Sequence, residues 1–180
     1  AAEIAETIEV IHVDSYPGDG NREIVRNYCE SLNINYKLII QHPKGVYKAL
    51  ELGKINACGE WLVTINSDDT MHGFRLKEII NFLKERINRS TSVVFFPIFY
   101  ESYGIKVGSP QNLKNIYDLD IFGSAHSVGM FIRNKIWKKL GSLYSSHKYC
   151  ADYDLYMRLL KNGYQIEYAC LLYTSPSPRD

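Results

Sequence analysis

Short apolar runs alternate with stretches of helical periodicity along most of this chain. Runs rich in Val, Ile, Leu and aromatic residues, bounded by polar residues, are typical of strands buried in a parallel sheet. Between these runs, apolar residues recur every three or four positions, as on one face of a helix. Strands are predicted at 8–13, 37–40, 61–65, 92–99, 127–132 and 165–169, and helices at 21–32, 46–57, 76–87, 135–140 and 152–161. The alternation predicts an α/β fold with a mostly parallel central sheet flanked by helices.

The pattern also predicts two finer features. In the first helix, Ile24, Val25, Tyr28 and Leu32 are predicted to share one face. The strand at 92–99 is a candidate for a hairpin with residues 105–107.

Both ends of the sequence depart from the pattern. Residues 1–7 resemble the end of a helix, whereas a doubly wound fold normally has a strand and a helix upstream of this point. Residues 171–180, LLYTSPSPRD, show neither a strand-like apolar run nor helical periodicity, and they look like a non-native or disordered tail. We therefore expect a single domain over 1–170 that lacks its first strand, followed by the tail 171–180.

Composition narrows the class of protein. A chain of 180 residues with 46% apolar and 23% charged residues is typical of one soluble globular domain. The net charge of +1 and the absence of a Lys/Arg cluster argue against a nucleic-acid partner. The 4 cysteines show no C-x-x-C pair, which favours free thiols in a cytoplasmic protein.

The strongest chemical signal follows the strand predicted at 61–65. That apolar run ends in Asn66, and two adjacent carboxylates follow at Asp68 and Asp69. Adjacent carboxylates repel each other unless a cation or a hydrogen-bond donor lies nearby. Oxygen ligands of this type suit a hard divalent ion that also carries substrate phosphates. The pattern predicts a phosphate-handling site at the carboxyl end of a strand, where open α/β sheets bind ligands.

Two turns add weaker candidates. Asp14 and Ser15 follow the first strand, and they could either cap a turn or contact a nucleobase or ribose. Lys44 and Gly45 precede a helix, so they could attract phosphate or be no more than a solvated loop.

Two further candidates lie nearer the end of the chain. His126 precedes an apolar strand, where a hydrogen-bonded structural histidine competes with a ligand or base. Asp152 opens a predicted helix, a position that suits both an N-terminal capping acid and a general base facing a cleft. The residues alone leave both pairs of alternatives open.

Taken together, four segments resemble a family 2 glycosyltransferase of the GT-A fold. The segments are VIHVDSYPGDG (10–20), HPKGVYKALELGKINACGEWLVTINSDD (42–69), HSVGMFIR (126–133) and ADYDLYMRLLKNGY (151–164). The likeness runs from about Ile8 to Tyr168, and it is nearest to bacterial enzymes of capsular, exopolysaccharide or O-antigen synthesis. It implies a Rossmann-like sheet that binds a nucleotide-diphosphate sugar, with Mn²⁺ or Mg²⁺ on the diphosphate.

The resemblance also assigns roles on the donor side. Asp14 matches the acid that contacts the nucleobase, usually uracil, and Ser15 lies beside it. Lys44 and Gly45 match a loop next to the nucleotide. The metal-binding region falls on Asn66, Asp68 and Asp69, with Asp68 as the main ligand, Asp69 as the second and Asn66 in place of an aspartate.

On the acceptor side, Asp152 matches the aspartate of the family's Glu-Asp motif, which acts as the catalytic base. Ala151 replaces the glutamate of that motif. His126 matches a histidine near the diphosphate or acceptor. The family's first strand, with its Thr-Tyr-Asn-like end, has no counterpart in the sequence.

The resulting expectation is an inverting, hexosyltransferase-type enzyme that moves a sugar, from UDP-sugar above all, to a hydroxyl of a saccharide or lipid-linked acceptor in cell-surface polysaccharide synthesis. It would work in the cytoplasm, and a lipid-linked acceptor would place it at the inner face of the plasma membrane. Two alternatives stay open: a nucleotidyltransferase, and a truncated module that binds nucleotide-sugar without catalysis.

Overall fold

The computed structural model of the chain describes residues 7–16, 18, 20–67, 69–71, 73–96, 99–102, 105–108, 129–141 and 151–169. The predicted sites at Asp68 and His126 and the tail 171–180 lie outside these residues. The elements, in chain order, are β1 (Glu9–Asp14), α2 (Asn21–Ser31), β2 (Asn35–Ile40), α3 (Val46–Asn56), β3 (Trp61–Leu62), α4 (Gly73–Glu85), β4 (Thr91–Phe95), β5 (Phe99–Ser102), β6 (Ile105–Gly108), β7 (Met130–Arg133), α5 (Asn134–Lys139), α6 (Ala151–Lys161) and β8 (Gln165–Tyr168).

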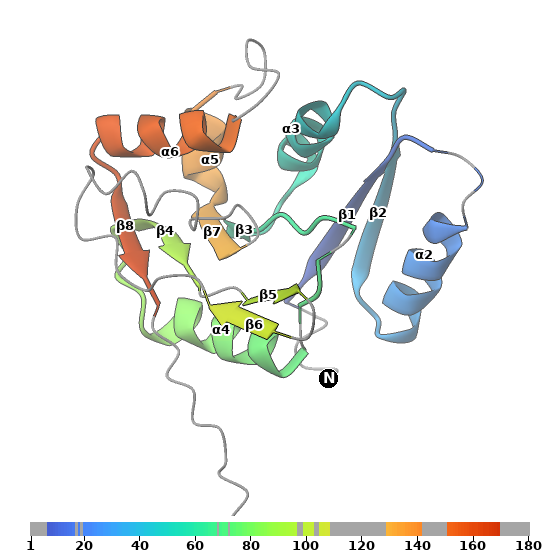
Figure 1. The fold of residues 1–180 in the computed structure, drawn as a ribbon, viewed down its shortest axis with the longest axis horizontal. Helices are drawn as coiled ribbons and strands as arrows, with labels where there is room; N and C mark the ends of the chain where they lie inside the picture. The colour runs from blue at the N-terminus through green and yellow to red at the C-terminus, as the bar shows by residue number, and fades with distance from the viewer. Residues whose placement is uncertain are drawn as a thin grey trace, which may run out of the picture.

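The strands form three separate sheets within the described residues (Figure 1). Strands β1 and β2 pair in parallel, in a register that runs from Glu9 opposite Asn35 to Asp14 opposite Ile40. The larger sheet has the order β3-β7-β4-β8. The strand predicted at 92–99 was expected to pair with 105–107, but β4 ends at Phe95 and pairs with β7 and β8. The antiparallel pair is formed instead by β5 and β6. The α/β class is confirmed.

The direction of β7 differs from the expectation of a mostly parallel sheet. It runs antiparallel to both β3 and β4, whereas β4 and β8 are parallel. An apolar run predicts burial on both faces of a sheet but carries no information on direction. A parallel neighbour needs a crossover, usually a helix, and β4 is followed instead by the pair β5–β6. The sheet is therefore mixed.

The core lies on both faces of the four-stranded sheet. Successive residues of a strand point to opposite faces. Val93 and Phe95 of β4 accordingly pack toward α5 and α6, while Val94 and the following Phe96 pack toward α4. Figure 1 shows α4 on one side of this sheet and α5 with α6 on the other. Every residue of β4 and β7 is buried.

The face of α2 was predicted only in part. Ile24 and Tyr28 are 66% and 65% exposed, so they do not cover the sheet. The inner line is formed by Cys29, which is buried, and by Val25 and Leu32, which are half-buried. Ile24 and Tyr28 each lie one position earlier than an inner residue, about 100° around a helix of 3.6 residues per turn. When apolar residues cover a broad part of a helix surface, the sequence can place the buried face one residue away from its true position.

Polar contacts join the β1–β2 sheet to the four-stranded sheet. At the start of β1, Oε1 of Glu9 accepts the backbone N–H of Cys58 at 2.6 Å and also that of Gly59, in the turn before β3. Within the described part of the chain, β1 pairs only with β2 and β3 only with β7, so each keeps one unpaired edge. The predicted additional first strand stays a prediction. No described helix combines the length and apolar character needed to cross a membrane.

Candidate functional site

Asp14 ends β1 with its carboxylate held on both oxygens. The residue is buried, with 9% of its surface exposed. Its Oδ1 accepts the backbone N–H of Tyr16 at 2.9 Å, and its Oδ2 forms an ion pair with Nε of Arg22 in the first turn of α2. The Tyr16 N–H lowers the pKa of Asp14 most, burial opposes that effect, and Arg22 lowers the pKa further. Asp14 is therefore an ionised, oriented acceptor at the end of a strand.

The parallel pairing brings a second loop to Asp14 and Ser15. Strand β2 ends opposite Asp14, and the backbone N–H of Gln41 donates to the carbonyl of Asp14 at 3.0 Å. Nε2 of Gln41 also donates to Oγ of Ser15 at 3.2 Å. The loop that starts at Gln41 leads directly to Lys44 and Gly45. The structure thus groups the first two sequence-predicted sites at one edge of the sheet.

The loop at Lys44 and Gly45 is exposed, and Gly45 has a backbone conformation that favours glycine. Its φ of 86° and ψ of 162° lie in a region that side chains rarely adopt. Gly45 is also the N-cap of α3, and no side-chain hydrogen bond caps that helix end. Free N–H groups at a helix start favour anions, so the loop and helix together offer a place for phosphate.

Asn66 and Asp69 form a small hydrogen-bonded turn after β3. Oδ2 of Asp69 accepts from the backbone N–H of Asn66 at 3.1 Å and from its side-chain Nδ2 at 2.8 Å. The backbone N–H of Asp69 donates in return to the carbonyl of Asn66 at 3.1 Å. The amide at position 66 therefore orients the carboxylate at position 69, and among the described residues the hydrogen bonds to this carboxylate all go to Oδ2.

The oxygen donors of this turn could serve a divalent ion that is also held by substrate. The described residues contain no group of three His, Cys, Asp or Glu side chains that could enclose a metal by themselves. Mg²⁺ typically takes one or two carboxylates and completes its shell with water and substrate phosphates. Asp69 could supply one such carboxylate, and Asp68 precedes it in the sequence. The oxygen donors present suit Mg²⁺ or Mn²⁺ better than a soft metal.

Asp152 lies in the first turn of α6 with its side chain exposed. Its Oδ1 accepts the backbone N–H of Tyr153 at 3.1 Å. Two residues further on, Asp154 is paired with Arg158 one turn later in the same helix. Unlike Asp154, Asp152 forms no ion pair with a lysine or arginine of the described residues, and its exposed carboxylate can face an incoming hydroxyl group.

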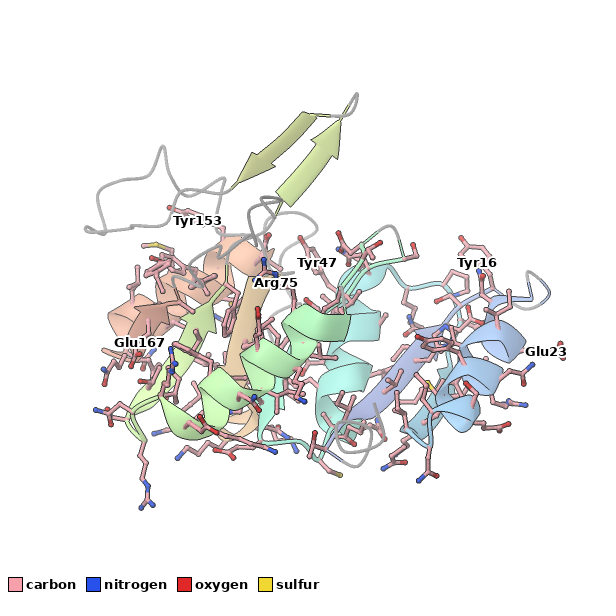
Figure 2. All side chains as sticks on the ribbon, turned by 90° about the horizontal axis from the view of Figure 1, so that it is seen from below. Tyr16, Glu23, Tyr47, Arg75, Tyr153 and Glu167 are labelled. Atoms are coloured by element: carbon pink, nitrogen blue, oxygen red, sulfur yellow. The ribbon has the colours of Figure 1, made fainter. Side chains whose placement is uncertain are left out.

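A tyrosine joins the helix after the Lys44 loop to the helix that carries Asp152. The hydroxyl of Tyr47, in the first turn of α3, accepts the backbone N–H of Ala151 at 3.1 Å. Figure 2 shows Tyr16, Tyr47 and Tyr153 along the same edge of the view, and these residues neighbour Asp14, Lys44 and Asp152 in the sequence. The sites predicted on three separate elements are therefore connected through α3.

Three residues at this edge were not predicted from the sequence: Arg22, Gln41 and Tyr47. One signal for Arg22 was available, because a basic residue in the first turn of a helix opposes the helix dipole and calls for a nearby carboxylate. Gln41 and Tyr47 carry no comparable local signal. Tyr47 and Ala151 are 104 positions apart, so only the fold brings them together.

A separate pocket of about 360 Å³ lies at the start of β3, whereas the turn at Asn66 and Asp69 follows the end of that strand. Its wall includes Asn134, whose Nδ2 donates to the carbonyls of Ala57 and Gly59 at 3.0 and 2.8 Å. Nζ of Lys138 donates to the same Ala57 carbonyl at 3.0 Å. These bonds satisfy peptide groups between α3 and β3. None of the predicted site residues lines this pocket, and its polar groups serve the fold.

Comparison with known proteins decides the family. The model of the family described as glycosyl transferase family 2 matches residues 2–141. The chain belongs to glycosyltransferase family 2. This family membership confirms the resemblance seen in the sequence, and a transferase of sugars is the class of enzyme that it supports.

Relatives of this family 2 glycosyltransferase include two uncharacterized glycosyltransferases. The one from Rickettsia typhi is 26% identical over 168 residues, and the one from Rickettsia prowazekii is 24% identical over 168 residues. Each match covers 89% of this chain and 52% of the relative. The chain therefore spans about half the length of the curated relatives it matches.

A solved structure supports the GT-A fold of this glycosyltransferase. The crystal structure of S. aureus TarS, residues 1–349, aligns with a TM-score of 0.69 at 19% identity. The alignment covers 92% of this chain and 49% of that chain. At this identity the likeness establishes the fold alone.

Proposed function

We propose that this family 2 glycosyltransferase is an inverting enzyme that transfers a sugar from a nucleotide-diphosphate sugar, chiefly UDP-sugar, to an acceptor hydroxyl. The observation that carries the proposal is the connection of three sites at one edge. Asp14 and the Gln41 loop meet at the ends of β1 and β2, and Tyr47 links the following helix to the one that carries Asp152. That edge holds an oriented acceptor, a phosphate-attracting loop and an exposed carboxylate, which donor binding and transfer require.

The donor would lie along the edge from Asp14 to the turn at Asn66. Asp14, with Ser15 beside it, would accept a hydrogen bond from the nucleobase, because its carboxylate is ionised and held in place. Lys44 and the start of α3 at Gly45 would attract the diphosphate. Asp69, oriented by Asn66, and Asp68 would hold Mg²⁺ or Mn²⁺, which when bound offsets the charge on the departing diphosphate.

Transfer would then need a base on the other side of the reacting carbon. Asp152 would take the proton of the acceptor hydroxyl as its oxygen attacks the anomeric carbon from the face opposite the leaving diphosphate. The bond to the diphosphate oxygen breaks as the new glycosidic bond forms, so the configuration inverts. His126 is proposed to lie near the diphosphate or acceptor. Positioning of the two reactants supplies a large share of the acceleration.

The proposed class of acceptor follows from the family resemblance. We propose a saccharide or lipid-linked hydroxyl used in cell-surface polysaccharide synthesis, with no nucleic-acid partner. A cytoplasmic enzyme would meet such an acceptor at the inner face of the plasma membrane. Nucleotide-sugars are water-soluble donors, which agrees with the exposed positions of Lys44 and Gly45.

The test is sugar transfer by the natural full-length protein with UDP-, GDP- and dTDP-sugars in the presence of Mn²⁺ or Mg²⁺. Asp68→Ala and Asp152→Asn should each lower the rate at least about a hundredfold. Asp154→Asn is the matched control, because Asp154 lies on the same helix and pairs with Arg158. Transfer that is unchanged in both site variants would refute the proposal.

Each of the two alternative functions predicts its own outcome, with its own substrates. A nucleotidyltransferase would release pyrophosphate from a nucleoside triphosphate and a sugar phosphate. A non-catalytic module would bind UDP-sugar without releasing UDP from it, whichever metal is supplied.

A further inference from the structure

Tyr47 connects two helices that the proposed reaction requires to act together. It is the second residue of α3, three positions after Lys44, and its hydroxyl reaches the first residue of α6. The backbone N–H of Ala151 is the donor in this bond, at 3.1 Å from the tyrosine oxygen. Asp152 is the next residue along α6.

The bond meets a need of the helix start. The first N–H groups of a helix have no partner within the helix, and burial of such a group without a partner is costly. Ala151 is fully buried, with 0% of its surface exposed, so water cannot take the place of the missing partner. The Tyr47 hydroxyl satisfies this donor instead. It also ties the position at which α6 begins to the position of α3.

Core packing around this hydrogen bond holds the Tyr47 side chain in place. The Tyr47 side chain packs against the core cluster that contains Ala151, Leu155 and Leu159 of α6. Further along α3, Nζ of Lys54 donates to the carbonyl of Gly141 at 3.0 Å, shortly after α5. The start of α3 is thus bonded to the start of α6, and the end of α3 is bonded to the residues that follow α5. A tilt of α6 relative to α3 would break the first attachment.

We propose that Tyr47 is a positioning residue for Asp152: its hydroxyl sets where α6 begins and so places the base carboxylate relative to the donor loop at Lys44. This inference rests on the proposed function. Tyr47 itself is assigned no contact with donor or acceptor. Displacement of a base by about one ångström lowers the rate of proton transfer without removing the donor site.

The experiment is steady-state transfer by the natural full-length protein carrying Tyr47→Phe, which removes only the hydroxyl. We expect kcat to fall about tenfold while the KM for the donor changes less than about twofold, because the donor contacts are intact. Tyr168→Phe is the matched control. It removes a hydroxyl that lies 3.4 Å from that of Tyr156 in the middle of α6, away from the start of that helix. This control should leave kcat unchanged.

A double-mutant cycle separates positioning from general destabilisation. If Tyr47 acts through Asp152, then Tyr47→Phe should have no further effect on the residual rate of Asp152→Asn. A tenfold loss in both backgrounds would show that the hydroxyl supports the fold at large and would overturn the inference. Melting temperatures of Tyr47→Phe and Tyr168→Phe should agree, and a selective drop for Tyr47→Phe that accounts for the lost activity would also overturn it.

Failure of this inference differs from failure of the proposed function. Asp152→Asn with full activity would remove the base assignment, and the role of Tyr47 with it. Asp152→Asn without activity, combined with an unaltered kcat in Tyr47→Phe, would overturn the role of Tyr47 alone.

Discussion

The two larger sheets of this protein differ in how deeply their strands are buried. In the four-stranded sheet, every residue of β4 and β7 is buried, and Val93, Val94 and Ile132 are 0% exposed. In the β1–β2 sheet, Asp14 is the one buried strand residue, and the others are half-buried or exposed. Because burial of apolar side chains stabilises a fold, we expect the deeply buried sheet to contribute more to stability. The shallower sheet presents Asp14, a predicted donor contact, whereas Asp152 lies on a helix that packs on the deeply buried sheet, so the proposed site draws on both.

The largest expected effect comes from truncating the same residue type in each sheet. Ile132→Ala removes a fully buried side chain and should lower the free energy of unfolding by about 2–5 kcal/mol. Ile40→Ala, at a position that is 64% exposed, should change it by no more than about 0.5 kcal/mol. Urea unfolding of both variants measures the difference. Equal losses would show that the two sheets share one core.

The next effect concerns the 180-residue chain by itself. The unpaired edges of β1 and β3 in the described part of the chain predict that it folds with low cooperativity or binds UDP weakly. Hydrogen exchange should then be faster in β1 and β2 than in β4 and β7. A single cooperative thermal transition together with micromolar UDP binding would contradict this view of the shallower sheet.

A smaller effect should appear at the acid of the shallower sheet. The pKa of Asp14 lies below its ordinary value of 3.8, chiefly because of the Tyr16 N–H and then Arg22. The carboxylate therefore stabilises the fold above the pH at which it titrates when unfolded, and this contribution is lost as the pH falls through the folded pKa.

Arg22→Met removes one of those causes and should raise the pKa of Asp14 toward its ordinary value. A carboxyl ¹³C titration by NMR measures the shift directly. Arg26→Met, at an exposed position of the same helix, is the matched control and should leave the Asp14 titration in place. An unaltered titration in Arg22→Met would mean that the ion pair does not hold in solution.

The smallest effect is expected at Lys44, which is exposed. Lys44→Ala should raise the KM for a nucleotide-sugar a few-fold and leave the free energy of unfolding within about 0.5 kcal/mol of wild type. The change should shrink as salt increases, because exposed charges are screened. Lys48→Ala, at an exposed lysine in the helix that follows, is the matched control. A salt-independent change would point to a packing role for Lys44.

The order of helices and strands was predictable because apolar period and turn residues are local properties of the sequence. Element ends deviate by a few residues: β3 covers Trp61–Leu62 where 61–65 was predicted, and α4 begins at Gly73 where 76 was predicted. The antiparallel direction of β7 was not predictable, since strand direction depends on how the connection crosses the sheet. The partners of side chains were not predictable for the same reason, because they too depend on the tertiary arrangement.

Candidate residues were predictable where the family's motifs cover them, but their partners were not. Asp14 was identified from the sequence, whereas its ion pair with Arg22 required the turn geometry between β1 and α2. The orienting bond from Asn66 to Asp69 is local and agrees with the choice of residue types. The contact between Tyr47 and Ala151 joins segments 104 positions apart, and the fold brings them together where Tyr47 packs against the core cluster that includes residues of α6.

The most direct measurement of the central claim follows the anomeric proton of the sugar by NMR while the natural full-length protein consumes UDP-sugar with Mn²⁺ and an acceptor. We expect UDP and a glycoside of inverted configuration to appear together, and Asp152→Asn to bind the donor but leave it intact. A product of retained configuration, or unchanged turnover in Asp152→Asn, would contradict the proposed mechanism.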